Sequence, residues 1–419
     1  MKHFRRFLSY AVLLFCLLLT TKTAQAQNPA ERTNASGDSV RVSLLTCGPR
    51  QNVYSLYGHT ALRYEDRGRG IDVAVNYGMF SFDKPFFVLR FVFGLTDYEM
   101  GIEPFEDFKR HYAPSGCGIW QQQLNLTADE KEALAAAIAL NYEPQNRVYR
   151  YNYFFDNCTT RARDIIEKNI EGRVGYGETA EGHPSFREMI HSYTAAHPWA
   201  AFGNDLLLGV KADLPASYEE QQFLPFNLKK DFSHARIFNT DGSDRPLVTG
   251  EGWLLPPEKR AHDEGFPFTP MQCAVAFAVA VAVLTLTEWH TKKNFWAVDA
   301  AILTVDALCG VILFAMIFSQ HPTVRLNFQI FLLNPLSAVY LWPAVKKLRK
   351  GIVSKWIYGW MIFMLLFFLG GIFQTYAEGM YIVALSLLFR YAIKSVQLIR
   401  QRNEKIFIDN CHARGTEWH

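Results

Sequence analysis

Hydrophobic and polar positions divide the chain into two unlike parts. Residues 27–268 mix short alternating stretches with charged turns, whereas residues 269–400 are almost continuously apolar. Five apolar stretches follow one another in the second part, at about 271–288, 295–318, 326–345, 356–376 and 380–398. Each is close to the roughly 20 residues that a helix needs to cross the hydrocarbon core of a bilayer. The pattern predicts an α+β domain followed by an all-α bundle of five transmembrane helices.

The basic residues between these stretches predict the orientation of the bundle. The first loop carries Lys292 and Lys293, the third loop is rich in Lys and Arg, and the second and fourth share only Arg325. Cytoplasmic loops concentrate Lys and Arg. We therefore expect the first part of the chain to lie outside the cytoplasmic membrane and the tail, residues 401–419, to lie in the cytoplasm.

The N-terminus supports the same orientation. It combines a basic start, an apolar run and the small-residue sequence AQA that ends at Ala26. These features predict a secretory signal over residues 1–26. An uncleaved anchor is the alternative, and the polar stretch after Ala26 favours cleavage. We expect residues 27–213 to form a globular domain and residues 214–268, rich in Pro, Phe and charge, to connect it to the membrane.

Cys158 is the first candidate for chemistry. It stands in DNCTTRARDII, where Asp156 and Asn157 are suitable N-caps for a helix that begins at the cysteine. The first turn of a helix favours the nucleophilic thiolate, and its free N–H groups are suited to hold an oxyanion. Three cysteines, Cys47, Cys117 and Cys158, fall in the external part, and their spacing does not decide which is unpaired. A small buried hydrophobic residue is the alternative role for Cys158.

His59 is the candidate base. The segments YGHTALRYE and IDVAVNYG alternate like the strands of a hairpin. An antiparallel register with DRGR as the loop gives three opposed pairs: Glu65 with Gly70, Arg63 with Asp72, and His59 with Asn76. Asn76 would then orient the imidazole, completing the nucleophile, base and orienting group of thiol catalysis. His111, His183, His191 and His197 are alternative bases.

Polar residues in or beside the apolar stretches need an explanation, because they are costly in a membrane. They are Asp299 and Asp306 in the second stretch, and His321, Arg325, Asn327 and Asn334 around the external end of the second and third stretches. Either they pair with one another and hold the bundle together, or they form a pocket for a lipid head group. The aromatic segment 84–98 is too short to span a bilayer, and we expect it in the core, with an acyl-chain lining or a membrane-contacting surface as alternatives.

Several of these segments together resemble one family. YGHTALRY (57–64), NYGMFSF (76–82), YNYFFDNCTTRARDII (151–166) and HPTVRLNFQIFLLNPL (321–336) are similar to segments of the Lnb-type lipoprotein N-acyltransferases of bacterial envelopes, and the resemblance covers nearly all of the mature chain. It implies a permuted papain-like domain in the periplasm, distantly related to NlpC-type and lecithin–retinol acyltransferase-like enzymes. It also implies transfer of an acyl chain from a phospholipid to the N-terminal amine of diacylated lipoproteins.

The resemblance implies that Cys158 is the nucleophile and His59 the base, whereas Asn76 as third member follows from the hairpin register. We expect Arg161, Arg163, His321 and Asn327 to contact the lipid substrate, with surface ion pairing as the alternative role of the two arginines. Neither a metal nor a cofactor is expected, because the sequence contains no Walker loop, dinucleotide fingerprint or HExxH motif. The formal net charge of +3 gives no indication of nucleic-acid binding. A thiol hydrolase of envelope substrates and a membrane scaffold remain alternative functions.

Overall fold

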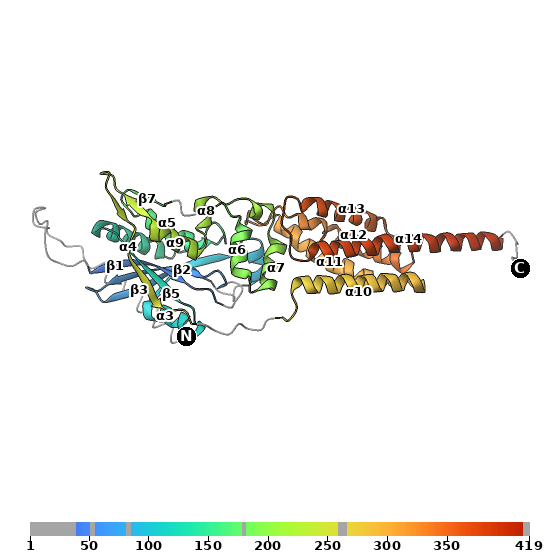
Figure 1. The fold of residues 1–419 in the computed structure, drawn as a ribbon, viewed down its shortest axis with the longest axis horizontal. Helices are drawn as coiled ribbons and strands as arrows, with labels where there is room; N and C mark the ends of the chain where they lie inside the picture. Colours follow the sequence, from blue (N-terminus) through green and yellow to red (C-terminus); the bar gives the residue numbers. More distant parts are fainter. Residues whose placement is uncertain (1–38, 51–54, 81–84, 178–181, 259–265, 414–419) are drawn as a thin grey trace, which may run out of the picture. The chain divides into compact units, whose positions relative to one another are not determined.

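The computed structural model describes residues 39–50, 55–80, 85–177, 182–258 and 266–413 (Figure 1). The predicted signal segment, residues 1–26, lies outside the described residues. A sheet-rich N-terminal domain is followed by a helical C-terminal region.

A seven-stranded antiparallel sheet organises the N-terminal domain. Its order is β10-β5-β1-β2-β3-β4-β6, and a second, three-stranded sheet has the order β7-β8-β9. The strands of the large sheet are β1 (Val40–Cys47), β2 (His59–Asp66), β3 (Ile71–Met79), β4 (Asp97–Pro104), β5 (Ile119–Leu124), β6 (Val148–Arg150) and β10 (Val248–Leu255). The small sheet contains β7 (Arg173–Gly175), β8 (Arg236–Phe238) and β9 (Asp244–Pro246).

The predicted hairpin exists, but its register was wrong by two residues. Ala61, and not His59, pairs with Asn76, and the last pair is Asp66 with Ile71. The Asp66 carboxylate accepts hydrogen bonds from the N–H groups of Gly68 and Arg69, at 2.9 and 3.2 Å. Asp66 therefore ends the strand, and the hairpin turn begins one residue later than predicted. A shift by two keeps every side chain on its predicted face, because the strand repeat is two residues.

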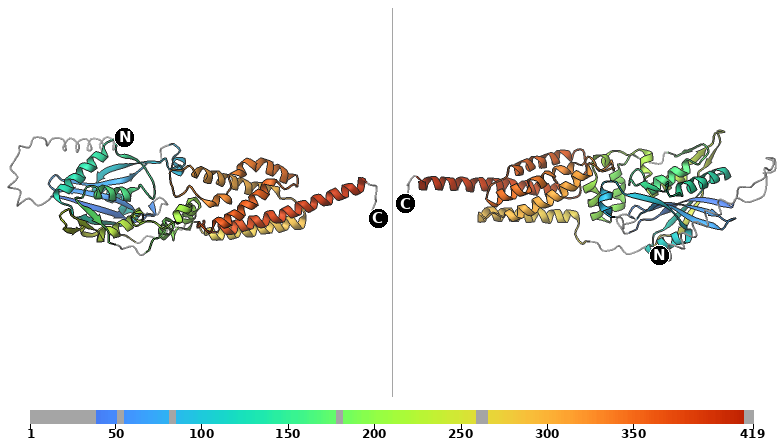
Figure 2. Two further views of the ribbon diagram at one scale, coloured as in Figure 1. Left: turned by 90° about the horizontal axis from the view of Figure 1, so that it is seen from above. Right: turned by 180° about the vertical axis from the view of Figure 1, so that it is seen from behind.

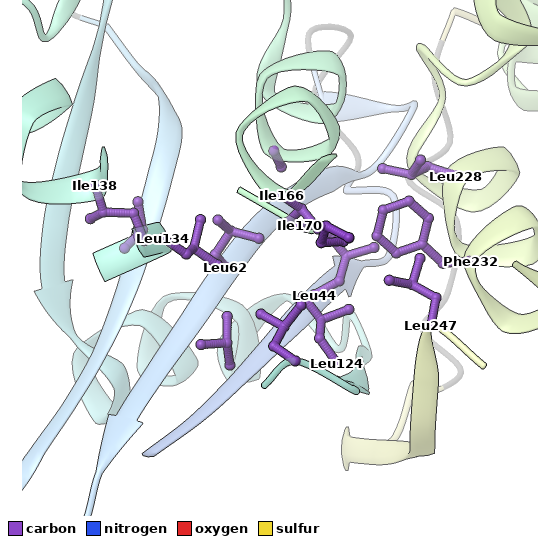
Figure 3. Packing of buried hydrophobic residues seen from close by; sticks show 14 of the residues in the cluster. Leu44, Leu62, Leu124, Leu134, Ile138, Ile166, Ile170, Leu228, Phe232 and Leu247 are labelled. Atoms are coloured by element: carbon purple, nitrogen blue, oxygen red, sulfur yellow. The ribbon is translucent and has the colours of Figure 1, made fainter. Parts of the chain in front are cut away.

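Helices cover both faces of the large sheet. On one face, α4 (Ala128–Tyr142), α5 (Cys158–Glu167) and α9 (Pro225–His234) bury an apolar core against the strands. Figure 3 shows Leu44, Leu62 and Leu124 of the strands close to Ile166 of α5 and to Leu228 and Phe232 of α9. On the other face, α3 (Phe105–Tyr112) packs its aromatic rings in a second core with Cys47, Ala61 and Ala74. The sheet is therefore buried on both sides where it carries the candidate residues.

Residues 214–268 are not the connecting segment that we expected. They supply α8 (Tyr218–Gln221), α9, two strands of the small sheet, and β10, which pairs with β5 at the edge of the large sheet. Leu228, Phe232 and Leu247 are fully buried in the main core. The chain between Asp213 and Leu255 therefore belongs to the folded N-terminal domain. Between α5 and this segment lie α6 (Phe186–Thr194), α7 (Pro198–Leu207) and the short helix η4 (Val210–Asp213).

The helical region contains α10 (Pro270–Thr291), α11 (Trp296–Met316), η5 (Phe328–Phe331), α12 (Leu336–Arg349), α13 (Lys355–Gly370) and α14 (Met380–Ala413). Within the described residues, four segments are long and apolar enough to cross a membrane: α10, α11, the stretch Phe328–Arg349 that includes α12, and α14 up to Asn410. The helix α13 is apolar but shorter, with 16 residues, so the expected count of five spans is not reached. Figure 2 shows α10 and α14 side by side.

The aromatic segment 84–98 was expected in the core, and most of its described apolar residues contradict this, although Tyr98 is buried. It contains the short helix α2 (Phe87–Val92), and Phe86, Leu89, Phe91 and Leu95 around it are exposed.

Candidate functional site

The start of α5 is held in place by Asn157. Its side-chain oxygen accepts hydrogen bonds from the N–H groups of Thr159 and Thr160 at 2.8 and 3.0 Å, and Thr160 closes a capping box. Its amide group donates to the carbonyls of Tyr153 and Phe223 at 2.8 and 3.0 Å. The cap fixes Cys158 as the first helical residue. The cap also occupies the N–H groups of Thr159 and Thr160, which could otherwise hold an oxyanion. The backbone N–H of Cys158 itself is the first-turn group left for this role.

The helix crosses the sheet so that Cys158 interacts with His59. The hydroxyl groups of Thr159 and Thr60 lie 3.1 Å apart and join α5 to β2. Burial opposes ionisation of Cys158, but the charge and hydrogen bond of His59 and the backbone N–H of Thr60 outweigh it, and the pKa of the thiol falls to about 7. Burial likewise opposes the charge of His59, yet Cys158 and Asn76 raise the pKa of the imidazole. The two residues therefore stabilise each other as thiolate and imidazolium.

Asn76 contacts His59 despite the shifted register. His59 Nε2 lies 2.8 Å from Asn76 Oδ1, and the N–H of Gly78 donates to the same oxygen at 2.9 Å. Because an amide oxygen only accepts, Nε2 carries a proton and Nδ1 is left to receive the proton of Cys158. His59 and Asn76 are diagonal neighbours across the strand pair, so the contact that we predicted from a wrong register is present.

Glu103, which the sequence did not point to, lies behind Asn76. Burial raises the pKa of Glu103, while the charge of His111 and a hydrogen bond from the Asn76 side chain act against this rise. His111 Nδ1 lies 3.4 Å from the Glu103 carboxylate. A chain of contacts thus runs from Cys158 through His59 and Asn76 to Glu103. Glu103 could have been found only through strand pairing, because β4 places it beside Ala74 and Asn76.

A cavity of about 290 Å³ opens onto these residues. Cys158, His59, Asn76 and Glu103 line it, and so does Arg50. The rest of its wall is largely aromatic: Tyr57, Phe80, Tyr98, Phe108, Tyr112, Tyr151, Tyr153 and Phe223. An apolar wall with a few convergent polar groups is typical of a small-molecule site.

Arg50 is a second residue that the sequence did not identify. It donates to the carbonyl of His111 at 3.2 Å, and its guanidinium lies 3.9 Å from the centre of the Tyr112 ring. Its Nε is buried and lacks a hydrogen-bond partner in the described part of the chain. A cationic donor therefore faces the cavity with hydrogen-bonding capacity to spare.

The two arginines predicted to contact lipid are already engaged. Arg161 makes two hydrogen bonds with Asp156, at 2.6 and 2.9 Å, and stacks on Tyr149. Arg163 is buried and bonded to Asp164 and Glu219. Neither lines the cavity. Both arginines fix the position of α5, which carries Cys158.

His321 and Asn327 do not line the cavity either. Asn327 is buried and donates to the carbonyl of Leu206 at 2.9 Å, while it accepts from Gln374 at 2.8 Å. Gln374 donates in turn to the carbonyl of Leu208, at 3.0 Å. These polar residues join the end of α7 to the membrane helices, a role that we did not anticipate.

The acidic residues of α11 are paired inside the bundle. Asp299 Oδ1 lies 2.7 Å from Arg390 Nε, and Asp299 Oδ2 lies 2.5 Å from Lys394 Nζ. Glu288 pairs with the same Arg390 and Lys394. We call these four residues, all buried, the ionic cluster. Asp306 instead accepts from the N–H of Asn334 at 2.8 Å. Ion pairing therefore accounts for Asp299, whereas Asp306 is held by the backbone N–H of Asn334 and its Oδ2 has no hydrogen-bond partner in the described residues.

The remaining external cysteines differ from Cys158. Cys47 and Cys117 are free buried thiols, and burial raises the pKa of Cys47 to about 12. Three of the four alternative histidines are placed elsewhere: His191 bonds to Asp205 at 2.9 Å, His197 precedes α7, and His183 is exposed. The fourth, His111, lines the cavity, where its Nδ1 contacts the Glu103 carboxylate. In the described residues, no group of His, Cys, Asp and Glu is arranged to hold a metal ion.

Two family models match the chain. The Lnb N-terminal periplasmic domain matches residues 26–192, and the Lnb transmembrane domain matches residues 261–402. No curated protein and no solved structure matches it. The two matches follow each other along most of the chain, and they cover the large sheet except β10, the pair Cys158 and His59, and the apolar helices up to residue 402. The chain is a multi-pass membrane protein with a periplasmic N-terminal domain, and it belongs to the Lnb-type lipoprotein N-acyltransferase family.

Proposed function

We propose that this protein transfers an acyl chain from a phospholipid, through a thioester on Cys158, to the N-terminal amine of diacylated lipoproteins. The observation that carries the proposal is the pairing of Cys158 with His59, which lowers the pKa of the thiol to about 7, in a cavity of a domain attached to membrane-spanning helices. Family membership supplies the reaction class. Both substrates are anchored in the bilayer, which gives the helical region a purpose.

The first half-reaction forms the thioester. His59 Nδ1 accepts the Cys158 proton, and the thiolate attacks the carbonyl carbon of a phospholipid ester. The C–S bond forms, the ester C–O bond breaks, and the lysophospholipid oxygen takes the proton from the imidazolium. The N–H of Cys158 is placed to donate to the oxyanion of the intermediate.

The second half-reaction forms the amide. The α-amino group of the lipoprotein cysteine attacks the thioester carbon, its proton passes to His59, and Cys158 leaves as thiolate. Water would hydrolyse the same thioester, so the aromatic wall of the cavity protects the intermediate. Asn76 keeps His59 in the required tautomer, and Glu103 positions Asn76.

The arrangement also supports a permuted papain-like domain. The order along the chain is His59, Asn76 and Cys158, and the cysteine begins a helix that packs on an antiparallel sheet. Arg50 is a better candidate than Arg161, Arg163, His321 and Asn327 for the contact with the donor phosphate. The Arg50 side chain faces the cavity and has no carboxylate partner in the described residues.

The test is the acylation state of a reporter lipoprotein, measured by mass spectrometry in cells that depend on this protein. Wild type should add the N-acyl chain, and Cys158→Ser and His59→Ala should add none, although immunoblots show each variant at the normal level. Persistence of the chain with Cys158→Ser would exclude the covalent mechanism.

A phospholipase is the second candidate, because it shares the first half-reaction. It predicts release of fatty acid by the wild type without any N-acylated reporter.

A further inference from the structure

The segment around α2 exposes apolar side chains where a soluble domain would be expected to bury them. Phe86 is 76% exposed and Leu89 is 55% exposed, and Phe91 and Leu95 are exposed as well. The charge of Arg90 in the same helix is compensated by Asp97, at 3.1 Å. Exposed apolar patches of this kind mark sites of contact with a partner or a membrane.

The same segment adjoins the end of a membrane-spanning helix. The N–H of Gln320 donates to the carbonyl of Phe93 at 2.9 Å, and the rings of Phe91 and His321 lie 6.0 Å apart. The approach is close at Gly94, where an added Cβ would lie 3.2 Å from the backbone nitrogen atoms of Gln320 and His321. Gln320 follows α11 by a few residues, and Phe318 between them is 66% exposed. The apolar surface of α2 is therefore continuous with that of the span.

The segment is also attached to the cavity at both of its ends. Phe80, just after β3, and Tyr98, in β4, both line the cavity, and their rings stack at 4.8 Å. The chain leaves the sheet after Phe80, forms α2 beside the end of α11, and returns to the sheet at Tyr98. The two ends of this segment thus belong to the aromatic wall near Cys158, while its middle contacts the chain that follows α11.

We propose that α2 inserts its exposed side chains into the periplasmic leaflet of the membrane and forms the entry by which a lipid acyl chain reaches the cavity. Short helices with an apolar face bind in this way at the boundary between head groups and acyl chains. Continuity with α11 favours lipid as the occupant over a second protein. Insertion stands independently of the chemistry, whereas the entry role rests on the proposed acyl transfer.

Photocrosslinking tests the insertion. Full-length protein with p-benzoylphenylalanine in place of Leu89 is reconstituted in phosphatidylethanolamine and phosphatidylglycerol vesicles and irradiated. Leu140 on α4, which is 60% exposed, is the matched control position. We expect a phospholipid adduct on the peptide that contains position 89 and none at position 140. Absence of a lipid adduct at position 89, or an adduct there with a second protein chain, would overturn the insertion.

A transfer assay tests the entry role. In vesicles, the double variant Phe86→Gln and Leu89→Gln should transfer acyl chains about tenfold more slowly, because polar side chains weaken burial in lipid. Alkylation of its Cys158 and its transfer from a short-chain phospholipid in detergent should match wild type. Unchanged transfer in vesicles would overturn the entry role. A wild type that crosslinks to lipid but transfers nothing would leave the insertion standing and refute the proposed function.

Discussion

Two buried polar groups of residues, one in each part of the chain, are built on opposite principles. The ionic cluster of Glu288, Asp299, Arg390 and Lys394 contains two acids and two bases in direct contact. The site at Cys158 instead combines groups that exchange protons easily, and it lines a cavity. Balanced charges in direct contact are suited to architecture, whereas a thiol whose pKa lies near neutral pH is suited to chemistry. The difference shows that burial of polar residues does not by itself indicate a reactive site.

Replacing His59 should give the largest effect on activity. His59→Ala removes the proposed base and the charge that stabilises the thiolate, and we expect the rate of acyl transfer to fall on the order of 10²-fold to 10⁴-fold. The melting temperature should stay close to that of wild type. The measurement is N-acylation of a lipopeptide by purified protein, and a variant with a rate within a factor of about three of wild type would contradict the role of base.

Replacing Arg390 should instead destabilise the protein. Arg390→Met leaves Asp299 and Glu288 with one cation between them, and breaking a buried ion pair costs about 3–5 kcal/mol. We expect a lower thermal midpoint and less protein in the membrane. Adding Asp299→Asn should restore part of the loss, and the exposed Arg402→Met on the same helix is the control. A stable but inactive Arg390→Met variant would assign chemistry to the ionic cluster.

The pH dependence of alkylation should distinguish Cys158 from the other thiols. Because its pKa is about 7, the rate with iodoacetamide should rise through pH 7 and level off above it, as thiolate replaces thiol. In His59→Ala the rise should move toward the ordinary cysteine value of 9.0 or beyond it, since burial then acts without the imidazolium. The control is Cys47→Ala, whose profile should be unchanged because the Cys47 pKa is about 12. A wild-type rise centred near pH 9 would refute the pairing.

Arg50 differs from the two cations of the ionic cluster, because no carboxylate in the described residues pairs with it. Arg50→Gln should raise KM for an anionic phospholipid donor about tenfold, the loss of one charged hydrogen bond, with a smaller change in kcat. The exposed Arg41→Gln is the control. Equal KM values for wild type and Arg50→Gln would remove Arg50 from the donor site.

Glu103 should give the smallest effect, because it acts through Asn76. Glu103→Gln keeps the size of the side chain but weakens its hold on the Asn76 amide, and we expect kcat to fall by up to about tenfold. Part of the loss should appear as a shifted pH profile, which a purely structural role would not produce. Glu99→Gln on the same strand is the control, and an identical response of both variants would contradict a positioning role.

The sequence predicted much of the site because the signals were local. The cap of Asn157 on the helix of Cys158 depends on neighbouring residues, and both were identified. The contact between His59 and Asn76 was identified in a wrong register, because the Asp66 carboxylate closes a turn that the alternation of apolar residues cannot reveal. Glu103 and Arg50 were missed because tertiary pairing brings them to the cavity.

The fold was predicted less well where an element depends on distant partners. The strand β10 contains Gly250 and Gly252 and has no buried residue, so it lacks the alternation of a half-buried strand. Its pairing with β5 alone makes it part of the sheet. The segment that contains α2 was predicted to lie in the core because it is apolar, but an exposed apolar surface near a membrane has the same composition. The helix α13 was counted as a span although only 16 residues of its stretch are helical.

The position of β10 has a consequence for biogenesis. The edge strand of the large sheet ends at Leu255, and the first apolar helix begins at Pro270. During secretion the large sheet therefore lacks β10 until almost the whole N-terminal domain has been exported. Until then β5 has no partner on its outer side. Completion of the fold and arrival of the first membrane segment at the translocation machinery then fall close together in time. A soluble fragment that ended at residue 213 would export an unfinished sheet with an open edge, the kind of surface that recruits chaperones and proteases.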